Sequence, residues 1–433
     1  MQWMLPAIAV IILAFAAVSR RLDGTSITAP MVFTGAGLVL GAKAAGLVDP
    51  TPSGATVKLL ASATLAVVLF GDAARIDLRA LREEFRVPAR LLGIGLPLTI
   101  AAGFAVALLL FGSLGWPEAL VLAIVLAPTD AALGQSVVTL PSLPSLIRQG
   151  LNVESGLNDG LCVPLFGIAI AIASTEAGLT GVHHAVVLVA EEIGYGVLVG
   201  VGVGAMAAAV VVFAGGRGLV EPLWLQVVPA AAAALAYTTA VAVHGSGFIA
   251  AFVAGLVFGA LRHRVGGEVG HLVEELGALL GAATFVVFGA AFLEPALSGI
   301  TWAVAGCAIL SLTVVRMIPV VIAMLGTKAR RPTLAFLGWF GPRGLASIVF
   351  AVLVVEESGT LPHEGLLLTT IYATVGLSVL LHGLTAAPLA RRYANWYSSH
   401  RASGVQAESA HEVRWRTNLA SPPRSQAGAG APS

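Results

Sequence analysis

Charged residues are scarce in this chain. They make up 11% of its 433 residues, whereas an ordinary soluble domain carries about 25%. Hydrophobic residues make up 57%, and the mean hydropathy is +0.91. This composition nearly excludes a water-soluble globular enzyme and predicts an all-α polytopic membrane protein.

The chain also has little net charge and few cysteines. The formal net charge is +1, so no nucleic-acid partner is expected, because such a partner requires a strongly basic balance. The two cysteines, Cys162 and Cys307, lie in apolar runs and form neither a disulfide framework nor a clustered metal site. No hydrolase motif is found and no histidine is assigned to the middle of the membrane. Neither an enzyme nor a cofactor is expected.

Apolar segments recur along the chain, and about thirteen are near the roughly 20 residues that a spanning helix needs. Arg20 and Arg21 follow the first segment rather than precede it, which favours a helix over a signal peptide. The expected segments are 3–19, 27–42, 57–74, 88–111, 117–137, 146–173, 185–213, 222–243, 246–261, 273–293, 302–325, 333–355 and 364–388.

Basic residues predict that the amino terminus lies outside and the carboxy terminus inside. In that orientation the outer loops hold only Lys43 and Lys58, as the positive-inside rule requires. Residues 391–433 are rich in Ser, Gly, Pro and Gln, and we expect them to form a mostly disordered cytoplasmic tail. Residues 1–390 would form the membrane domain.

Five ionisable residues fall where charge costs roughly 2.5–3.5 kcal/mol each on insertion scales. At about 1.5 Å per residue, Asp130, Asp159, Arg316 and Arg343 lie within roughly 5 Å of the segment centres, and Glu154 about 8 Å to the cytoplasmic side. The alternative to a functional site is that these residues form salt bridges that only hold helices together. For Glu154, paired with one arginine, this alternative is as good as a functional role. Three acids facing two arginines still leave one carboxylate that must be protonated or bind a mobile cation.

Residues 154–160 of the sixth segment read ESGLNDG. On a helix, Ser155 and Asp159 share one face and Glu154 and Asn158 share another. The first pair offers a hydroxyl and a carboxylate, two hard oxygen ligands, to a small cation. In the second pair, Asn158 would orient Glu154 while an arginine neutralises the carboxylate.

Prolines interrupt the fifth and twelfth segments at mid-depth, in the sequences LAPTDAA (126–132) and GWFGPRG (338–344). A kink would explain either proline alone, but the two segments run in opposite directions, and matched interruptions in two inverted halves indicate a secondary-transporter site. There Asp130 would offset the amino-terminal ends of the half-helices and Arg343 the carboxy-terminal ends. The Thr129 carbonyl would then be free to coordinate a cation.

These three motifs resemble those of the monovalent cation/proton antiporter family, in its Asn-Asp branch of NhaP-like sodium/proton exchangers. The resemblance covers about residues 3–390. It implies a homodimer in the cell membrane, with two inverted repeats and crossed broken helices. Segments 4–6 and 11–13 would form a core that moves like an elevator against segments 1–3 and 7–10, which hold the dimer together.

The resemblance also implies a role for single residues. Asp159 is expected to be the carboxylate that the cation and the proton share, with Ser155 and the Thr129 carbonyl as further ligands. Relatives often carry a glutamate of the third segment at the site. Here Asp72 is shorter and displaced by one position. It either joins the site, lines an inner vestibule or is an ordinary polar residue at the membrane interface.

For the remaining charged residues, the resemblance implies that Asp130 caps the crossed half-helices and that a core arginine bridges Glu154. Arg316 is favoured for that bridge and Arg343 for the crossing, with the reverse assignment left open.

Competition at one carboxylate predicts exchange of a cation for a proton. Burial disfavours the charged form of Asp159 and a bound cation favours it, so only the loaded carrier crosses. With Asn158 uncharged and Glu154 paired, we expect electroneutral exchange of sodium or lithium for protons in a one-to-one ratio, serving pH homeostasis. A potassium/proton antiporter of the same fold is the close alternative. A cation channel is the rival class, although it would need a continuous pore.

Overall fold

The computed structural model describes residues 4–22, 25–41, 54–76, 86–130, 133, 142–174, 179–262, 270–327, 329–356 and 361–400. Over these ranges the chain is helical, with turns and short unwound stretches and no strand. The prediction of an all-α protein is therefore confirmed.

Every predicted apolar segment overlaps one or more helices. Among the described residues, nine helices are long and apolar enough to cross a membrane, and four shorter apolar helices accompany them. The number of crossings and the orientation remain predictions. The helices of the amino-terminal half are α1 (Met4–Leu22), α2 (Ala29–Leu40), α3 (Gly54–Arg75), α5 (Arg86–Arg90), η1 (Leu91–Gly95), α6 (Leu96–Leu110), α7 (Trp116–Val125), α9 (Ser145–Ser174), α10 (Leu179–Ala209) and η2 (Val210–Gly215).

The rest of the chain is also helical. Its elements are α11 (Pro222–Ala242), α12 (Gly247–Arg262), α13 (His271–Val287), η3 (Phe288–Leu293), α14 (Glu294–Ala296), η4 (Leu297–Gly299), α15 (Trp302–Leu312), α16 (Val314–Ala323), α17 (Arg331–Trp339), α18 (Leu345–Glu356) and α19 (Glu364–His400).

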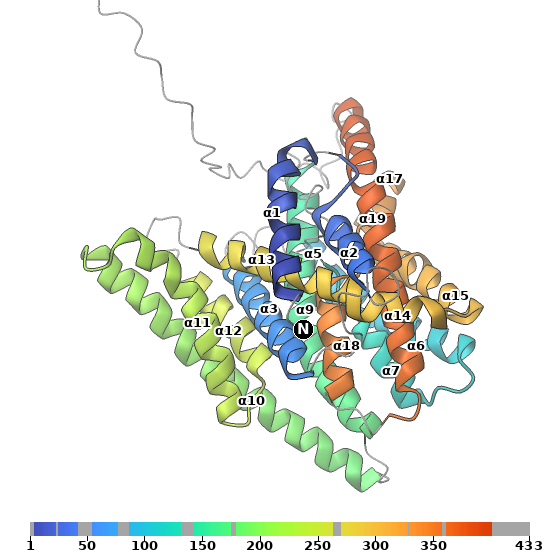
Figure 1. Cartoon of the computed structure of the whole chain (residues 1–433), viewed down its shortest axis with the longest axis horizontal. Coiled ribbons are helices and arrows are strands. Elements are labelled where there is room, and N and C mark those ends of the chain that lie inside the picture. The colour runs from blue at the N-terminus through green and yellow to red at the C-terminus, as the bar shows by residue number, and fades with distance from the viewer. Residues whose placement is uncertain are drawn as a thin grey trace, which may run out of the picture.

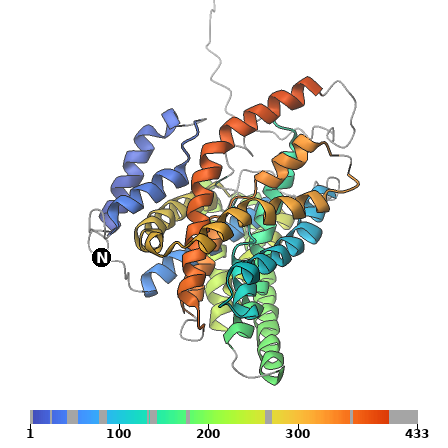
Figure 2. The same ribbon diagram turned by 90° about the vertical axis from the view of Figure 1, so that its right-hand side faces the viewer.

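The helices form two groups with α3 and α9 between them. Figure 1 shows α10, α11 and α12 together at one side of the molecule and α6, α7 and α15 at the other. Figure 2 shows α1 and α2 at the edge of the molecule. The side chains of α1 are largely exposed, as expected for a helix that faces lipid or another copy of the chain.

Small residues bring α12 close to α3. A Cβ atom added to Gly259 would lie 2.5 Å from the carbonyl oxygen of Ala74, so only glycine fits this crossing without displacing the backbone. The neighbouring Phe258 packs on Phe70, with 5.7 Å between ring centroids. Close packing of this kind holds helices together where the surrounding lipid is as apolar as the side chains.

The last helix continues beyond the predicted start of the tail. α19 runs to His400, and the Tyr393 ring stacks on Phe336 of α17 with 4.4 Å between centroids. The Tyr393 hydroxyl also lies within hydrogen-bond distance of Thr333, at 2.9 Å. The boundary at residue 391 is therefore ten residues too early for the helix, because aromatic packing holds this turn. The predicted tail beyond His400 lies outside the described residues.

We expect Gly259→Ala to lower the melting temperature of the purified protein by several degrees, because overpacking costs about 1–3 kcal/mol. Gly202→Ala on α10 is the matched control, since a Cβ atom there meets nothing within 4 Å. Both changes bring the same gain in helix propensity, so the difference between their melting curves in detergent measures the packing. Equal melting temperatures would contradict this role of Gly259.

Candidate functional site

Two unwound stretches lie against each other at the centre of the site. α7 ends at Val125 and α17 ends at Trp339, and each is followed by a stretch that contains a proline. The backbone N–H of Asp130 donates to the carbonyl of Pro342 at 2.8 Å. The Ser347 hydroxyl of α18 donates to the Val125 carbonyl at 2.7 Å. Each break therefore supplies partners for backbone groups that the other leaves open.

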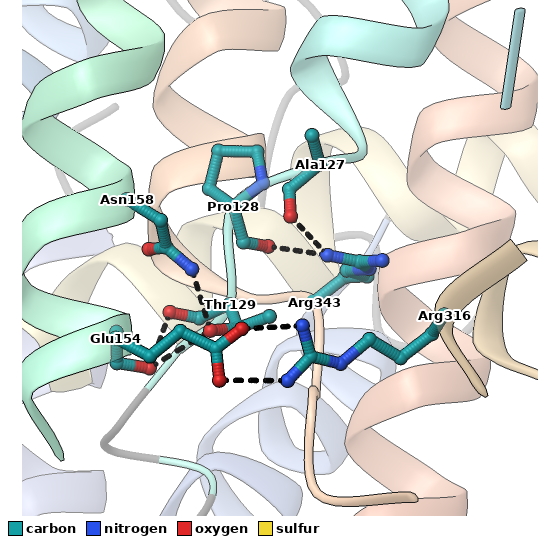
Figure 3. Close-up of polar contacts among 8 residues, drawn as sticks. Ala127, Pro128, Thr129, Glu154, Asn158, Arg316 and Arg343 are labelled. Atoms are coloured by element: carbon teal, nitrogen blue, oxygen red, sulfur yellow. Dashed lines mark hydrogen bonds and ion pairs between the residues drawn. The ribbon is translucent and has the colours of Figure 1, made fainter. Parts of the chain in front are cut away.

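Asp130 and Arg343 lie at the ends of the half-helices, with charges that offset the helix dipoles. Asp130 Oδ2 accepts a hydrogen bond of 2.7 Å from the backbone N–H of Leu345, the first residue of α18. Arg343 Nη1 donates to the carbonyls of Ala127 and Pro128, the second at 3.1 Å (Figure 3). The carboxylate is thus at a positive helix start and the guanidinium at carbonyls that follow a helix end.

Glu154 and Arg316 form a buried ion pair between α9 and α16. Arg316 Nη1 lies 2.5 Å from Glu154 Oε1, and Nη2 lies 2.8 Å from Oε2 (Figure 3). Both side chains are 3% exposed. Of the two buried arginines, it is Arg316 that pairs with Glu154. A Cβ atom at Gly341 would overlap the Arg316 guanidinium, so the ion pair lies directly beneath the unwound stretch.

Hydrogen bonds join the motif of α9 to Thr129. The Ser155 hydroxyl donates to the Thr129 carbonyl at 2.6 Å, and the two hydroxyl oxygens lie 3.0 Å apart. The Asn158 amide donates to Thr129 Oγ1 at 2.7 Å (Figure 3). The expectation that Asn158 orients Glu154 is therefore wrong. The unwound stretch brings Thr129 within reach of the amide, while Arg316 occupies both oxygens of Glu154.

Asp159 lies on the same face of α9, one turn after Ser155. It is 7% exposed, and within the described part of the chain its Oδ1 has no hydrogen-bond partner and its carboxylate forms no ion pair. Arg316 is bound to Glu154, and Arg343 donates to backbone carbonyls. Within the described residues neither buried arginine forms an ion pair with Asp159.

Asp72 approaches the motif from α3. Its Cβ atom would lie 3.3 Å from a Cβ added to Gly156, so Asp72 packs beside the turn that carries Ser155. Its side chain is 26% exposed, and Oδ1 is 4.0 Å from Arg75 Nη1. The structure brings Asp72 next to the motif but leaves it in contact with the exterior, which does not decide among the roles that the sequence leaves open.

Sequence reasoning missed the polar residues of α19. His382 is 1% exposed and Ser378 is fully buried, and His382 lies in the middle of the candidate span Glu364–Ser399. The sequence analysis assigned no role to this buried histidine. The signal was a serine and a histidine four residues apart inside the segment 364–388, where polar side chains are expensive.

The ligands that this site can offer are oxygen atoms. Over the described residues no three His, Cys, Asp or Glu side chains gather as they would around a transition metal. The Ser155 hydroxyl contacts the Thr129 carbonyl, and the Asp159 carboxylate follows one turn later on the same face of α9. Such a set suits a hard cation of low charge that has to leave again.

Known proteins that resemble the chain in sequence are named as antiporters. Residues 7–392 match the family described as "Sodium/hydrogen exchanger, transmembrane". The chain is 28% identical over 364 residues to the Na(+)/H(+) antiporter NhaP of Pseudomonas aeruginosa, covering 76% of this chain and 79% of the relative. It is 24% identical over 341 residues to the K(+)/H(+) antiporter NhaP2 of Shewanella oneidensis, covering 78% of this chain and 58% of that relative.

One solved structure with a similar fold is the sodium proton antiporter MjNhaP1 from Methanocaldococcus jannaschii at pH 8. The TM-score is 0.74 at 16% sequence identity, and the match covers 88% of this chain and 99% of that one. At this identity the likeness shows the fold alone.

We expect Arg316→Leu to cost about 3–5 kcal/mol of stability, because it leaves the Glu154 carboxylate buried without a partner. The matched control is Arg75→Leu, whose ion pair with Glu274 has side chains that are 41% and 35% exposed. That change should cost no more than about 1 kcal/mol. Thermal unfolding in detergent measures both.

The double variant Glu154→Leu/Arg316→Leu should recover much of the loss, because it removes the stranded charge together with its partner. If the double variant were no more stable than Arg316→Leu, the stranded carboxylate would not be the cause.

Proposed function

Because the chain belongs to the sodium/hydrogen exchanger family, we propose that it exchanges sodium or lithium for protons. It is a multi-pass protein of the cell membrane, and its relatives are transporters rather than enzymes. One observation supports the proposal above all others. Among the described residues Asp159 is a buried carboxylate without an ion-pair partner, and it shares a face of α9 with Ser155, whose hydroxyl donates to the Thr129 carbonyl.

Asp159 would carry either the cation or the proton. Burial makes a bare carboxylate costly, so a proton or a cation must neutralise it before the site crosses the membrane. The Ser155 hydroxyl now donates to the Thr129 carbonyl. When a cation arrives, this bond opens and both oxygens turn toward the ion, while the proton leaves Asp159. Cation and proton thereby exclude each other.

The fixed partners of the other acids support a one-to-one ratio. Glu154 is held by two hydrogen bonds from Arg316, and Asp130 caps the start of α18. Asn158 carries no charge. A single carboxylate then changes its charge state in each cycle, so that one cation replaces one proton and no net charge moves. Asp72, whose side chain is partly exposed, would attract cations toward the site.

The contacts of the site also support an elevator movement. The polar contacts join α7 and the stretch after it, α9, α16 and α18, so these helices would move as one core together with α5, η1, α6, α15, α17 and α19. The remaining helices would form the stationary part and the homodimer contact.

The test of the function is exchange in proteoliposomes that contain a pH-sensitive dye. Addition of sodium or lithium to vesicles with an acidic lumen should raise the lumenal pH, and Asp159→Asn should reduce this signal to that of empty vesicles. Glu274→Gln neutralises a half-exposed carboxylate and should keep the signal. Exchange by Asp159→Asn at the wild-type rate would remove Asp159 from the carrier role. A response to potassium alone would replace sodium as the substrate.

A separate experiment tests the proposed ratio of one cation to one proton. In vesicles whose membrane potential is set by a potassium gradient and valinomycin, the rate of sodium/proton exchange should be the same at zero potential and at about −100 mV. An electrogenic cycle would gain about 2.3 kcal/mol per charge from that potential and would speed up or slow down. A dependence of the rate on potential would therefore contradict the one-to-one ratio.

A further inference from the structure

The break after α17 separates two backbone groups that an unbroken helix would join. The carbonyl of Trp339 and the N–H of Arg343 are four residues apart, the spacing of an α-helical hydrogen bond. Here the Trp339 carbonyl lies 3.0 Å from His382 Nε2 and also accepts from the N–H of Gly341 at 2.9 Å. The Arg343 N–H donates to Ser378 Oγ at 2.7 Å.

The two replacement partners lie on adjacent turns of α19. Ser378 and His382 are themselves four residues apart, and Ser378 Oγ lies 3.3 Å from His382 Nδ1. We propose that this serine–histidine clip takes the place of the missing backbone hydrogen bond and positions Arg343 at the candidate cation site. The effect on transport rests on the proposed function, whereas the clip itself does not.

Burial makes both partners necessary. Arg343 and Ser378 are 0% exposed and His382 is 1% exposed, so water is not available to replace a lost partner. Without Ser378 the buried Arg343 N–H would be unpaired, and without His382 the Trp339 carbonyl would keep only the N–H of Gly341. Each loss is costly. The Trp339 ring packs on the imidazole with 5.2 Å between centroids. This contact keeps the imidazole aimed at the carbonyl of the same residue.

The hydrogen positions follow from the partners. A carbonyl only accepts, so His382 Nε2 carries a hydrogen and donates it to Trp339. Ser378 Oγ accepts from Arg343. His382 Nδ1 lies 3.3 Å from this oxygen and 3.1 Å from the Ser378 carbonyl, so the second ring nitrogen stays on the same turn of α19. The clip therefore requires of residue 382 a donor at the position of Nε2. A neutral side chain with a donor at the same place, such as glutamine, should then replace the imidazole.

The clip lies two contacts away from the candidate ligand. The backbone of Arg343 is held by Ser378, and its side chain donates to the carbonyls of Ala127 and Pro128. The next residue along the chain is Thr129, whose carbonyl we propose as a cation ligand. Loss of the clip should loosen this carbonyl and weaken cation binding more than it slows the loaded carrier.

The transport test separates affinity from rate. His382→Leu should raise the KM for sodium by about tenfold, the order of effect expected when a buried carbonyl loses one of its two donors, with a smaller change in the maximal rate. His382→Gln should restore the KM to within about twofold of the wild type, because it keeps a neutral donor. A His382→Gln variant as defective as His382→Leu would overturn the hydrogen-bond role.

Thr385→Val is the matched control. Thr385 lies on α19 near His382 and accepts a hydrogen bond of 2.9 Å from the indole N–H of Trp339, so its loss removes a contact to the ring but not to the carbonyl. Its KM should equal that of the wild type. An increase in KM as large as that of His382→Leu would show that any loosening of Trp339 suffices, and would overturn the clip.

Hydrogen–deuterium exchange tests the clip without transport. Ser378→Ala should increase deuterium uptake in peptides that cover residues 340–346, because the Arg343 N–H loses its acceptor, and leave peptides of α13 unchanged. Unchanged uptake at 340–346 would overturn the clip. If the wild-type protein exchanges none of sodium, lithium or potassium for protons, the proposed function fails, and the deuterium result still decides the clip.

Discussion

Backbone groups that are exposed by a broken helix have to find partners inside the protein, because lipid offers none. This constraint shapes the whole centre of the molecule. The Asp130 N–H bonds to Pro342, the Ser347 hydroxyl bonds to Val125, and Arg343 donates to carbonyls of the opposite stretch. Two interruptions that would each be costly alone become stable because they face each other. The cation site that we propose would be formed by the few oxygen atoms that remain beside them.

The buried charged side chains are also held by partners inside the protein. Both buried arginines have fixed partners, since Arg316 binds Glu154 and Arg343 binds the carbonyls that follow a helix end. Asp130 is held at a helix start. Asp159 is left as a buried carboxylate with no fixed cation. A site of this kind needs a mobile positive charge, which is the physical basis for the transport we propose.

Much of this arrangement could be predicted from the chain. Apolar runs predict the helices, the prolines at 128 and 342 predict the breaks, and charges at mid-segment identify the polar centre. The prediction failed for residues whose role depends on which distant residue they contact. Asn158 binds Thr129 rather than Glu154, and α19 continues to His400 because Tyr393 stacks on Phe336. His382 was overlooked because its partner, the Trp339 carbonyl, is a backbone group that the helical pattern had already assigned to an ordinary hydrogen bond.

The sequence by itself determined that this is an all-helical membrane protein with two interrupted helices and with charged residues inside the membrane segments. It could do so because hydropathy, proline and the cost of buried charge are local properties. Only the tertiary structure decided which arginine pairs with Glu154, which group the Asn158 amide contacts and which side chains close the break after Trp339. These choices depend on distances between helices that are far apart along the chain, and several partners at each point would have satisfied the same chemistry.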